Sequence, residues 1–351
     1  MIRIQDHLNI DNPEAYIDSK ALSLWDALNP TLKGKSKKVY FKKSLIEKCK
    51  KYQKLTKSPD YLSKYANNNL IVGIRHKAFF DYLLASKAAN LKQLIISRPS
   101  QFSSIQTNIF RILHPNDLYT GTPGNYSQTA FGSLLSDKIF NYTAFRASDF
   151  CIKLFTEIGF QSTTCPYCND NKLNIIELQI DSKAYLELDH FYSKSQNPFF
   201  AVSFFNLIPS CHDCNSSDKG DKPFSIETHI HPYHEAFDEA YLFKISLKAL
   251  LGDRIDNIDI ENISTKTLDK TLVDLNLQAR YRNNFEAATK LVNLFFKYKK
   301  YFKTEFEAAF KELLLKDIPI EKKNILKYQR GKMNRDLLKQ IDIDNALNLL
   351  E

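Results

Sequence analysis

Two short stretches decide how the middle of this chain folds: CPYCND at residues 165–170 and SCHDCNSSDKGD at residues 210–221. Each contains a C-x-x-C pair, and together they hold four of the six cysteines. Two pairs of equal spacing favour metal ligation over chance or a redox pair, and four thiolates can enclose Zn²⁺ tetrahedrally with no open position. We therefore predict one structural zinc, which contributes folding free energy to a small centre. The expected ligands are Cys165, Cys168, Cys211 and Cys214, with His212 as an alternative.

Short β segments and a loop separate the two cysteine pairs. The segments LNIIELQI (residues 173–180) and AYLELDH (residues 184–190) alternate in polarity, which indicates two strands joined by a turn at residues 181–183. The stretch FYSKSQNPFFAVSFFN (residues 191–206) indicates an irregular loop rich in aromatic residues. The second cysteine pair then leads into a short helix. These patterns predict a zinc-stapled β/α centre over residues 164–234.

Helical patterns flank this centre on both sides, because apolar residues recur there at spacings of three and four. We predict a basic helical N-terminal region at residues 1–115 and a helical C-terminal region at residues 235–351. A linker and helical lead-in fill residues 116–163, and the Gly- and Pro-rich stretch at residues 116–129 must be a loop. The predicted fold class is therefore mainly α with a small zinc-stapled centre. The expected helices cover residues 45–52, 103–114, 131–142, 147–160, 246–252, 268–302 and 304–316.

The composition is that of a globular protein. Of 351 residues, 43% are hydrophobic and 25% are charged, which is enough apolar material for a real core. The length suits one elaborated domain or two to three modules. No apolar stretch approaches the ~20 residues that span a bilayer, so the sequence excludes a membrane protein. The start MIRIQDHLNIDNPE lacks the apolar core of a secretory signal, and we therefore expect a cytoplasmic protein.

Positive charge is concentrated in the N-terminal part of the chain. Residues 1–150 contain 22 Lys and Arg against 11 Asp and Glu, whereas the remainder contains 27 against 29. The densest run lies between residues 33 and 58. A basic part beside a near-neutral one suits a polyanionic partner such as nucleic acid, although a solvated helix face or an acidic protein partner would give the same pattern. The lysines expected to contact nucleic acid are Lys42, Lys43, Lys50, Lys51 and Lys54.

The stretches LELDHFYSKS (residues 186–195) and FFNLIPSCHDCNSSDKGD (residues 204–221) resemble the HNH, or ββα-metal, nuclease motif. The resemblance covers about residues 164–224, implies a treble-clef-like ββα-metal module at residues 164–234, and suggests a metal-dependent endonuclease. It implies His190 as the general base that activates water, with Asn206 fixing the loop that orients it. Asp189 and Asn215 are the implied holders of Mg²⁺ or Mn²⁺.

This chemistry suits phosphodiester hydrolysis. The reaction needs a deprotonated water and a cation beside the crowded negative charge, and a neutral histidine can take the proton. A carboxylate and an amide oxygen suit a hard ion such as Mg²⁺. Lys219 is a candidate phosphate contact, but three residues separate it from Asn215 where HNH proteins commonly have two. Asp218 is therefore a further candidate for assisting the metal.

Weaker likenesses extend outward from this motif. FNYTAFRASDFCIKLFTEIGF (residues 140–160), HPYHEAF (residues 231–237) and LVDLNLQARYRNNFEAATKLV (residues 272–292) are similar to HNH nucleases of bacterial anti-phage systems, namely the Septu nuclease subunit and retron-associated proteins. That resemblance implies DNA as substrate and an ATPase partner subunit. The alternatives are cleavage of RNA such as tRNA, and a non-catalytic zinc module that binds nucleic acid or scaffolds an assembly.

Three further histidines follow the second cysteine pair in HIHPYH, residues 229–234. They offer a second metal cluster. The proline and the uneven spacing instead favour packing or phosphate contact for His229, His231 and His234.

Overall fold

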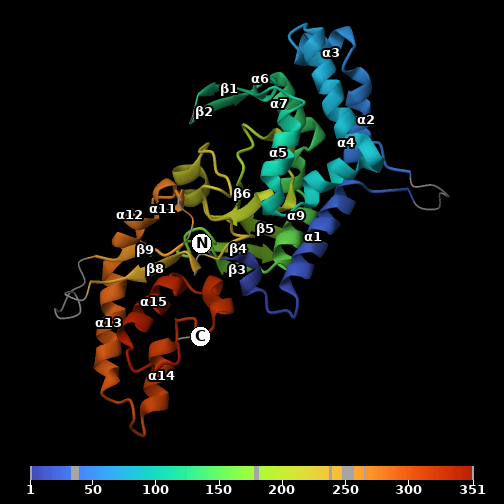
Figure 1. Ribbon diagram of the computed structural model, residues 1–351. Helices are drawn as coiled ribbons and strands as arrows, with labels where there is room; N and C mark the ends of the chain where they lie inside the picture. Colours follow the sequence, from blue (N-terminus) through green and yellow to red (C-terminus); the bar gives the residue numbers. More distant parts are fainter. Residues whose placement is uncertain are drawn as a thin grey trace.

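The computed structural model describes residues 2–32, 39–122, 124–177, 182–236, 239–246, 257–264, 266 and 268–349. Figure 1 shows helices toward both ends of the molecule and small β-sheets between them. The chain is mainly helical, as predicted, and the paired strands are antiparallel. None of the described helices combines the length and the apolar character needed to cross a membrane.

The N-terminal part is a set of helices that begin at clear capping residues. The side chains of Asn12, Ser44 and Ser58 each accept a backbone N–H of the first turn, which satisfies donors that a helix start otherwise leaves unpaired. The helices predicted at residues 45–52 and 103–114 are confirmed with small shifts of their ends. The elements are η1 (Ile4–His7), α1 (Pro13–Leu28), α2 (Leu45–Leu55), α3 (Pro59–Tyr65), α4 (Leu70–Ile96, broken at residues 85–88), η2 (Pro99–Gln101) and α5 (Phe102–Phe110).

A β-hairpin stands where we predicted a loop at residues 116–129, so that prediction was wrong. Strands β1 (Tyr119–Thr122) and β2 (Asn125–Gln128) pair antiparallel. Gly121 in β1 has a φ of +109°, and a Cβ there would lie 2.2 Å from the carbonyl oxygen of Asn125, so only glycine fits at this position. Further elements of this part are α6 (Pro115–Leu118), α7 (Ala130–Ser133), the π-helical η3 (Leu134–Ile139), α8 (Tyr142–Arg146) and α9 (Asp149–Glu157).

Two small sheets form the centre of the molecule. Strands β3 (Ser162–Thr164), β4 (Lys172–Glu177) and β5 (Ser182–Tyr185) make one sheet, and β6 (Glu187–His190) pairs antiparallel with β7 (Leu207–Ser210) in another. The segment predicted as one strand at residues 184–190 is thus divided at Leu186 between two sheets. Between β6 and β7 lie the short turns η4 (Pro198–Phe200) and η5 (Phe204–Asn206), and η6 (Asp213–Lys219) follows β7.

The described residues of the C-terminal part include helices and a pair of antiparallel strands, β8 (Tyr241–Lys244) with β9 (Asp259–Asn262), where we expected helix throughout. Of the helix predicted at residues 246–252, all but residue 246 lies outside the described residues. The expected helix at residues 268–302 is divided into three. The elements are α11 (Thr271–Asp274), α12 (Leu277–Arg282), α13 (Phe285–Lys299), α14 (Glu307–Leu315), η8 (Lys322–Lys327) and α15 (Gly331–Ile341).

Buried apolar side chains from residue 4 to residue 349 form one continuous cluster. The aromatic run at residues 198–208 supplies its middle, and Phe199, Phe200 and Phe204 are fully buried. This run holds the loop between β6 and β7 against the N-terminal helices, where Ser203 Oγ donates to the carbonyl of Leu94. The loop that follows the predicted catalytic histidine is therefore part of the core.

Candidate metal and catalytic centre

The two cysteine pairs come together at the centre of the molecule. The first knuckle (residues 165–168) turns between β3 and β4, and the second (residues 211–214) follows β7 and enters η6. All four cysteines are buried and unbonded to one another. Their sulfurs lie within 4.8 Å of one another, and Cys168 Sγ is 3.9 Å from Cys211 Sγ. A tetrahedral site with Zn–S bonds of about 2.3 Å places sulfurs about 3.8 Å apart, so this group can bind a metal such as zinc.

Donors around the sulfurs favour thiolates. The backbone N–H of Cys211 points at Cys165 Sγ at 3.4 Å, and Arg280 Nη1 of α12 lies 3.1 Å from Cys214 Sγ. Arg280 also pairs with Asp218 of η6, at 3.0 Å. Four thiolates around a divalent ion leave a net negative charge, and a guanidinium beside them offsets part of it. The C-terminal helices therefore complete the surroundings of the knuckles.

Asn169 ties the first knuckle to the C-terminal part, and sequence reasoning missed it. Its backbone is left-handed, with a φ of 51°. Its Nδ2 group donates to Thr164 Oγ1 at 2.7 Å and to the carbonyl of Ile325 at 3.1 Å, while its Oδ1 accepts the N–H of Lys332 at 2.9 Å. An asparagine after the second cysteine is no signal by itself, because its partners Ile325 and Lys332 lie 156 and 163 residues away in the sequence.

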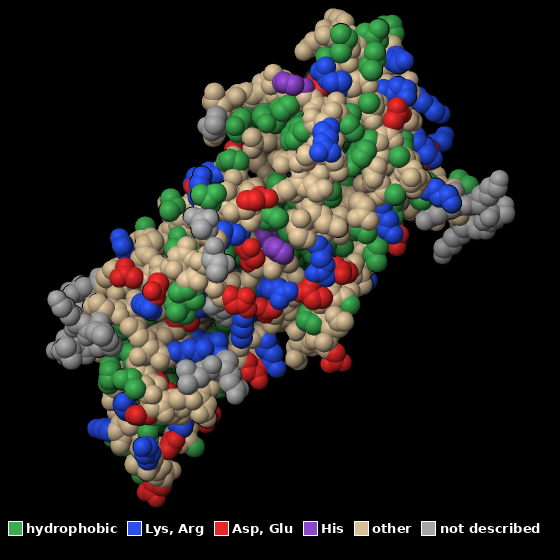
Figure 2. Space-filling view, in the orientation of Figure 1, with side chains coloured by type: hydrophobic (Ala, Val, Ile, Leu, Met, Phe, Trp, Pro, Cys, Tyr) green, Lys and Arg blue, Asp and Glu red, His purple; other side chains and the backbone are tan. Residues whose placement is uncertain are grey.

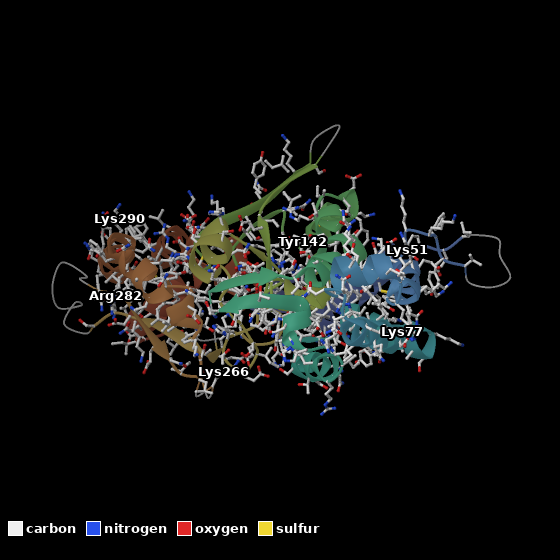
Figure 3. All side chains as sticks on the ribbon, turned by 90° about the horizontal axis from the view of Figure 1, so that it is seen from above. Lys51, Lys77, Tyr142, Lys266, Arg282 and Lys290 are labelled. Atoms are coloured by element: carbon white, nitrogen blue, oxygen red, sulfur yellow. The ribbon has the colours of Figure 1, made fainter. Side chains whose placement is uncertain are left out.

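His190 ends β6 with its ring fixed in one orientation. Its Nε2 lies 2.9 Å from the carbonyl oxygen of Ala201, which can only accept, so Nε2 carries the hydrogen and Nδ1 is left as the acceptor. The edge of Tyr142 packs on the ring at 4.5 Å between centroids, and Figure 3 labels this tyrosine near the middle of the molecule. Burial lowers the pKa of His190 to about 3, helped by the charges of Lys194 and Lys219 and opposed by the hydrogen bond to Ala201. The ring is therefore neutral, with Nδ1 unprotonated.

Asp189 precedes His190 on β6 and is 1% exposed. Tyr167, inside the first knuckle, donates its hydroxyl to Oδ2 at 2.5 Å, and Lys219 Nζ lies 2.7 Å from Oδ1. Lys219 also donates to the carbonyl of His190 at 2.7 Å and is 2% exposed. We predicted Lys219 as a phosphate contact, and the structure places its ammonium on Asp189. Sequence reasoning missed Tyr167, although it stands between two predicted ligands.

The two predicted asparagines have different surroundings. Asn206 is fully buried, and its side chain bonds the N–H of Tyr192 at 2.7 Å and the carbonyls of Tyr192 and Phe200 at 3.1 and 3.2 Å. The Asn206 side chain thus joins the start of the loop between β6 and β7, at Tyr192, to its middle, at Phe200. Asn215 Nδ2 donates to Glu187 at 2.8 Å, and the same carboxylate accepts from His212 and Ser216.

A π-type turn accommodates the extra residue between Asn215 and Lys219. The N–H of Gly220 bonds the carbonyl of Asn215, five residues earlier, at 2.8 Å. A π-turn holds one more residue than an α-turn and often marks a functional site. Asn215 and Lys219 consequently line one cavity, of about 500 Å³, together with Asp189 and His190.

The donor chemistry of this cavity fits a hard divalent ion, since a carboxylate and an amide line it beside the histidine. Asp189 Oδ1 is the oxygen in contact with the ammonium of Lys219, so an ion held there takes the place of that ammonium. Asp218 is turned away toward Arg280 and Asn276.

The predicted nucleic-acid lysines lie apart from the cavity. Figure 2 shows Lys and Arg side chains gathered over α2, α3 and α4, and Figure 1 shows these helices toward one end of the molecule, with β6 nearer its middle. Lys50 pairs with Glu47 at 2.7 Å. The basic residues at 33–38 lie outside the described residues. All five predicted side chains are exposed: Lys42, Lys43, Lys50, Lys51 and Lys54.

The three histidines after the second knuckle do not converge on one point. His229 is bonded to Thr228 and Asp274, each at 2.9 Å, and His231 accepts the N–H of Tyr233 at 3.1 Å. His234 is exposed. Among the described residues, the His, Cys, Asp and Glu side chains that lie close enough together in a group of three or more to hold a metal are the four cysteines. The packing interpretation is therefore the one that the structure favours for His229 and His231.

Comparisons with known proteins give one local likeness. No family model and no solved structure matches the chain. A curated protein, "Protein ea31" of Escherichia phage lambda, is 38% identical over 71 residues, which is 20% of this chain and 20% of that protein. The likeness thus spans a fifth of that relative's length.

Proposed function

We propose that this protein is a metal-dependent endonuclease of the HNH class that hydrolyses phosphodiester bonds in DNA. The observation that carries the proposal is the environment of His190. Its Nε2 is held by the carbonyl of Ala201, its Nδ1 remains an acceptor, and it lines a cavity with Asp189 and Asn215. A zinc ion on the four cysteines would hold β6, β7 and η6 in this arrangement. The resemblance to Septu and retron-associated nucleases supports a role in anti-phage defence with an ATPase partner.

Each residue of the cavity has a task in this reaction. His190 takes the proton of the attacking water at Nδ1, while the bond to Ala201 keeps the ring from turning. Asn206 maintains the loop that presents the Ala201 carbonyl. Asp189 and Asn215 would hold a Mg²⁺ or Mn²⁺ ion, which supplies positive charge to the phosphate and the leaving oxygen when bound.

The ion pair of Lys219 and Asp189 supports a second candidate function. The buried ammonium of Lys219 already neutralises the carboxylate of Asp189, so this carboxylate needs no divalent ion to compensate its charge. In that case the centre is a non-catalytic zinc module that binds nucleic acid.

Cleavage assays separate the two candidates. We would incubate the zinc-loaded protein with supercoiled plasmid, single-stranded DNA and RNA, with Mg²⁺ or Mn²⁺ or with neither, alongside Asp189→Asn as the matched control. We expect nicked and linear products that need the added ion and the Asp189 carboxylate. Binding to nucleic acid without product in any arm would favour the non-catalytic module, and product from RNA alone would move the substrate from DNA to RNA.

A further inference from the structure

A second cavity, of about 580 Å³, adjoins the cavity lined by Asp189, His190, Asn215 and Lys219, which we call the catalytic cavity after its proposed function. The turn at residues 193–197 contributes to both cavities, and Ser193 lines both. The β1–β2 hairpin, which projects from the body of the molecule in Figure 1, also borders both, with Tyr119 at the second cavity and Tyr126 at the catalytic one. One bound molecule can therefore extend from His190 into the second cavity.

Aromatic rings and side-chain amides line this second cavity. Its size falls within the ~300–1,000 Å³ of sites that take small organic groups. Gln106 Nε2 donates to Asn197 Oδ1 at 2.7 Å, which holds these two amides together in the wall. Lys222 and Lys270 add positive charge and Asp274 adds one negative charge, and Lys222 Nζ donates to the carbonyl of Asp274 at 2.7 Å. The rings are those of Phe110, Tyr119, Tyr192 and Phe224, and Gln196 is a third amide.

We propose that the second cavity binds one unpaired nucleobase of the strand whose phosphate lies at His190. Aromatic faces stack on any base, and amides can hydrogen-bond to a base edge. The two lysines suit the phosphate that follows this base. The inference rests on the proposed function and specifies its substrate: a single strand, or a strand with one nucleotide turned out of its helix.

A paired base could not use this cavity. In a duplex both faces of a base are covered by its neighbours and its edge is bonded to the partner strand, so the base must leave the stack to enter a protein pocket. A nuclease with such a cavity should therefore bind unpaired strands better than a duplex of the same sequence.

Tyr119 is the best residue for a test, because it lies on the hairpin and contributes a ring without belonging to the catalytic group. Its ring meets that of Tyr126 edge-on at 5.2 Å. Tyr119→Ala removes the stacking face, and Tyr119→Phe keeps it. Tyr185→Ala is the matched control, since Tyr185 is 59% exposed on β5 and lines neither cavity.

The experiment measures binding without cutting. Short DNA and RNA single strands carry a fluorescent adenine analogue at successive positions, with zinc retained and no Mg²⁺ or Mn²⁺ added. We expect the emission at one position to be quenched on binding. Tyr119→Ala should weaken that binding by roughly 5- to 150-fold, the range for losing one stacking side chain, while Tyr119→Phe and Tyr185→Ala bind as the wild type does. The DNA and RNA arms show which strand is preferred.

A strand with an abasic site at the quenched position tests whether the base itself is bound. Tyr119→Ala should change its affinity little, because no base is present to stack. Unchanged emission at every position, or an equal loss on the abasic and complete strands, would overturn the inference. Cleavage of DNA without quenching would support the proposed endonuclease function and contradict the base-binding site. Quenching without cleavage would support the base-binding site and contradict the endonuclease function.

Discussion

Lys219 carries its ammonium into the interior of the site, 2.7 Å from Asp189 Oδ1. Both side chains are almost fully buried, so each depends on the other for compensation of its charge. Removing one partner of a buried pair typically costs about 3–5 kcal/mol, because the other charge is left unpaired. A divalent ion at Asp189 and the Lys219 ammonium are therefore competitors for one oxygen.

Lys219→Met should make the protein more responsive to a divalent ion. We expect the variant to unfold at a lower temperature than the wild type without added metal, and Mn²⁺ to raise its unfolding temperature more than it raises that of the wild type. Thermal unfolding of the zinc-loaded proteins with and without Mn²⁺ measures this. Lys194→Met is the control, since Lys194 lines the same cavity without bonding Asp189. Equal Mn²⁺ shifts in all three proteins would show that Lys219 and metal do not compete.

Local spacing explains which residues the sequence could identify. The cysteines and the pair Asp189-His190 stand in short motifs, and the sulfurs do lie together. The roles of Tyr167 and Asn169 could not be predicted from a local motif. Their partners, Asp189 and residues 325–332, come from other parts of the sequence. The ammonium of Lys219 could not be placed for the same reason.

Helix α12 connects the C-terminal part to the second knuckle through one side chain. Arg280 lies 3.1 Å from Cys214 Sγ, 3.0 Å from Asp218 and 3.7 Å from Asp213. Groups that bond to metal ligands hold them in orientation and stabilise their charged form. The orientation of η6 is therefore tied to the helices that follow it.

Arg280→Met should release zinc more readily. Loss of such a supporting group typically lowers metal affinity by roughly 10- to 100-fold. Zinc transfer to a chromophoric chelator, followed over time, measures the change. Arg282→Met on the same helix is the matched control, because Arg282, labelled in Figure 3, is exposed and makes a 3.7 Å contact with Asp259. If both variants release zinc as the wild type does, the guanidinium has no part in holding the metal.

Among the secondary-structure elements, the helices were predicted better than the strands. A helix such as α2 shows its cap and its apolar spacing within a single turn or two of sequence. The pairs β1–β2 and β8–β9 depend on cross-strand pairing, which no local pattern contains, and the Gly- and Pro-rich turn between β1 and β2 looks the same as a loop. The division of residues 184–190 between two sheets depends on partners in β4 and β7, which no local pattern contains.

Across the whole molecule, the basic helices α2–α4 lie toward one end, apart from β6, which carries His190 (Figure 1). Exchanging the five predicted lysines for Gln should weaken DNA binding for all sequences alike. Each lost phosphate contact should flatten the slope of log affinity against log salt by about 0.9 for duplex DNA. Binding across a salt series, with no divalent ion added, measures this slope.

A charge-matched control separates local contact from net charge. Five exposed C-terminal lysines serve as the control set: Lys290, Lys297, Lys300, Lys303 and Lys316. Exchanging these five for Gln should change the slope of log affinity against log salt less than exchanging the five predicted lysines does. An unchanged slope in the α2 variant would assign these lysines to a protein partner or to solubility.

Buried histidines make the stability of the molecule depend on pH. Burial lowers the pKa of His7 and of His76 to about 4, so in the folded state both stay neutral where the unfolded chain takes up a proton. Stability should therefore fall as the pH drops from about 6.5 toward 4, by up to about 1.4 kcal/mol per pH unit for each histidine. Denaturant unfolding across this range measures the slope. Replacing His76 with Gln should flatten it, and an unaltered slope would contradict the assignment.

The proposed role of His190 is tested most directly by single-turnover cleavage with His190→Ala. The control is His234→Ala, because His234 is exposed and lines neither cavity. Zinc content and affinity for uncut DNA are measured on the same samples. We predict that His190→Ala keeps both but cleaves roughly 10²- to 10⁴-fold more slowly, the usual effect of losing a general base, while His234→Ala cleaves at the wild-type rate. Cleavage by His190→Ala at the wild-type rate would contradict the proposal that this ring activates the water.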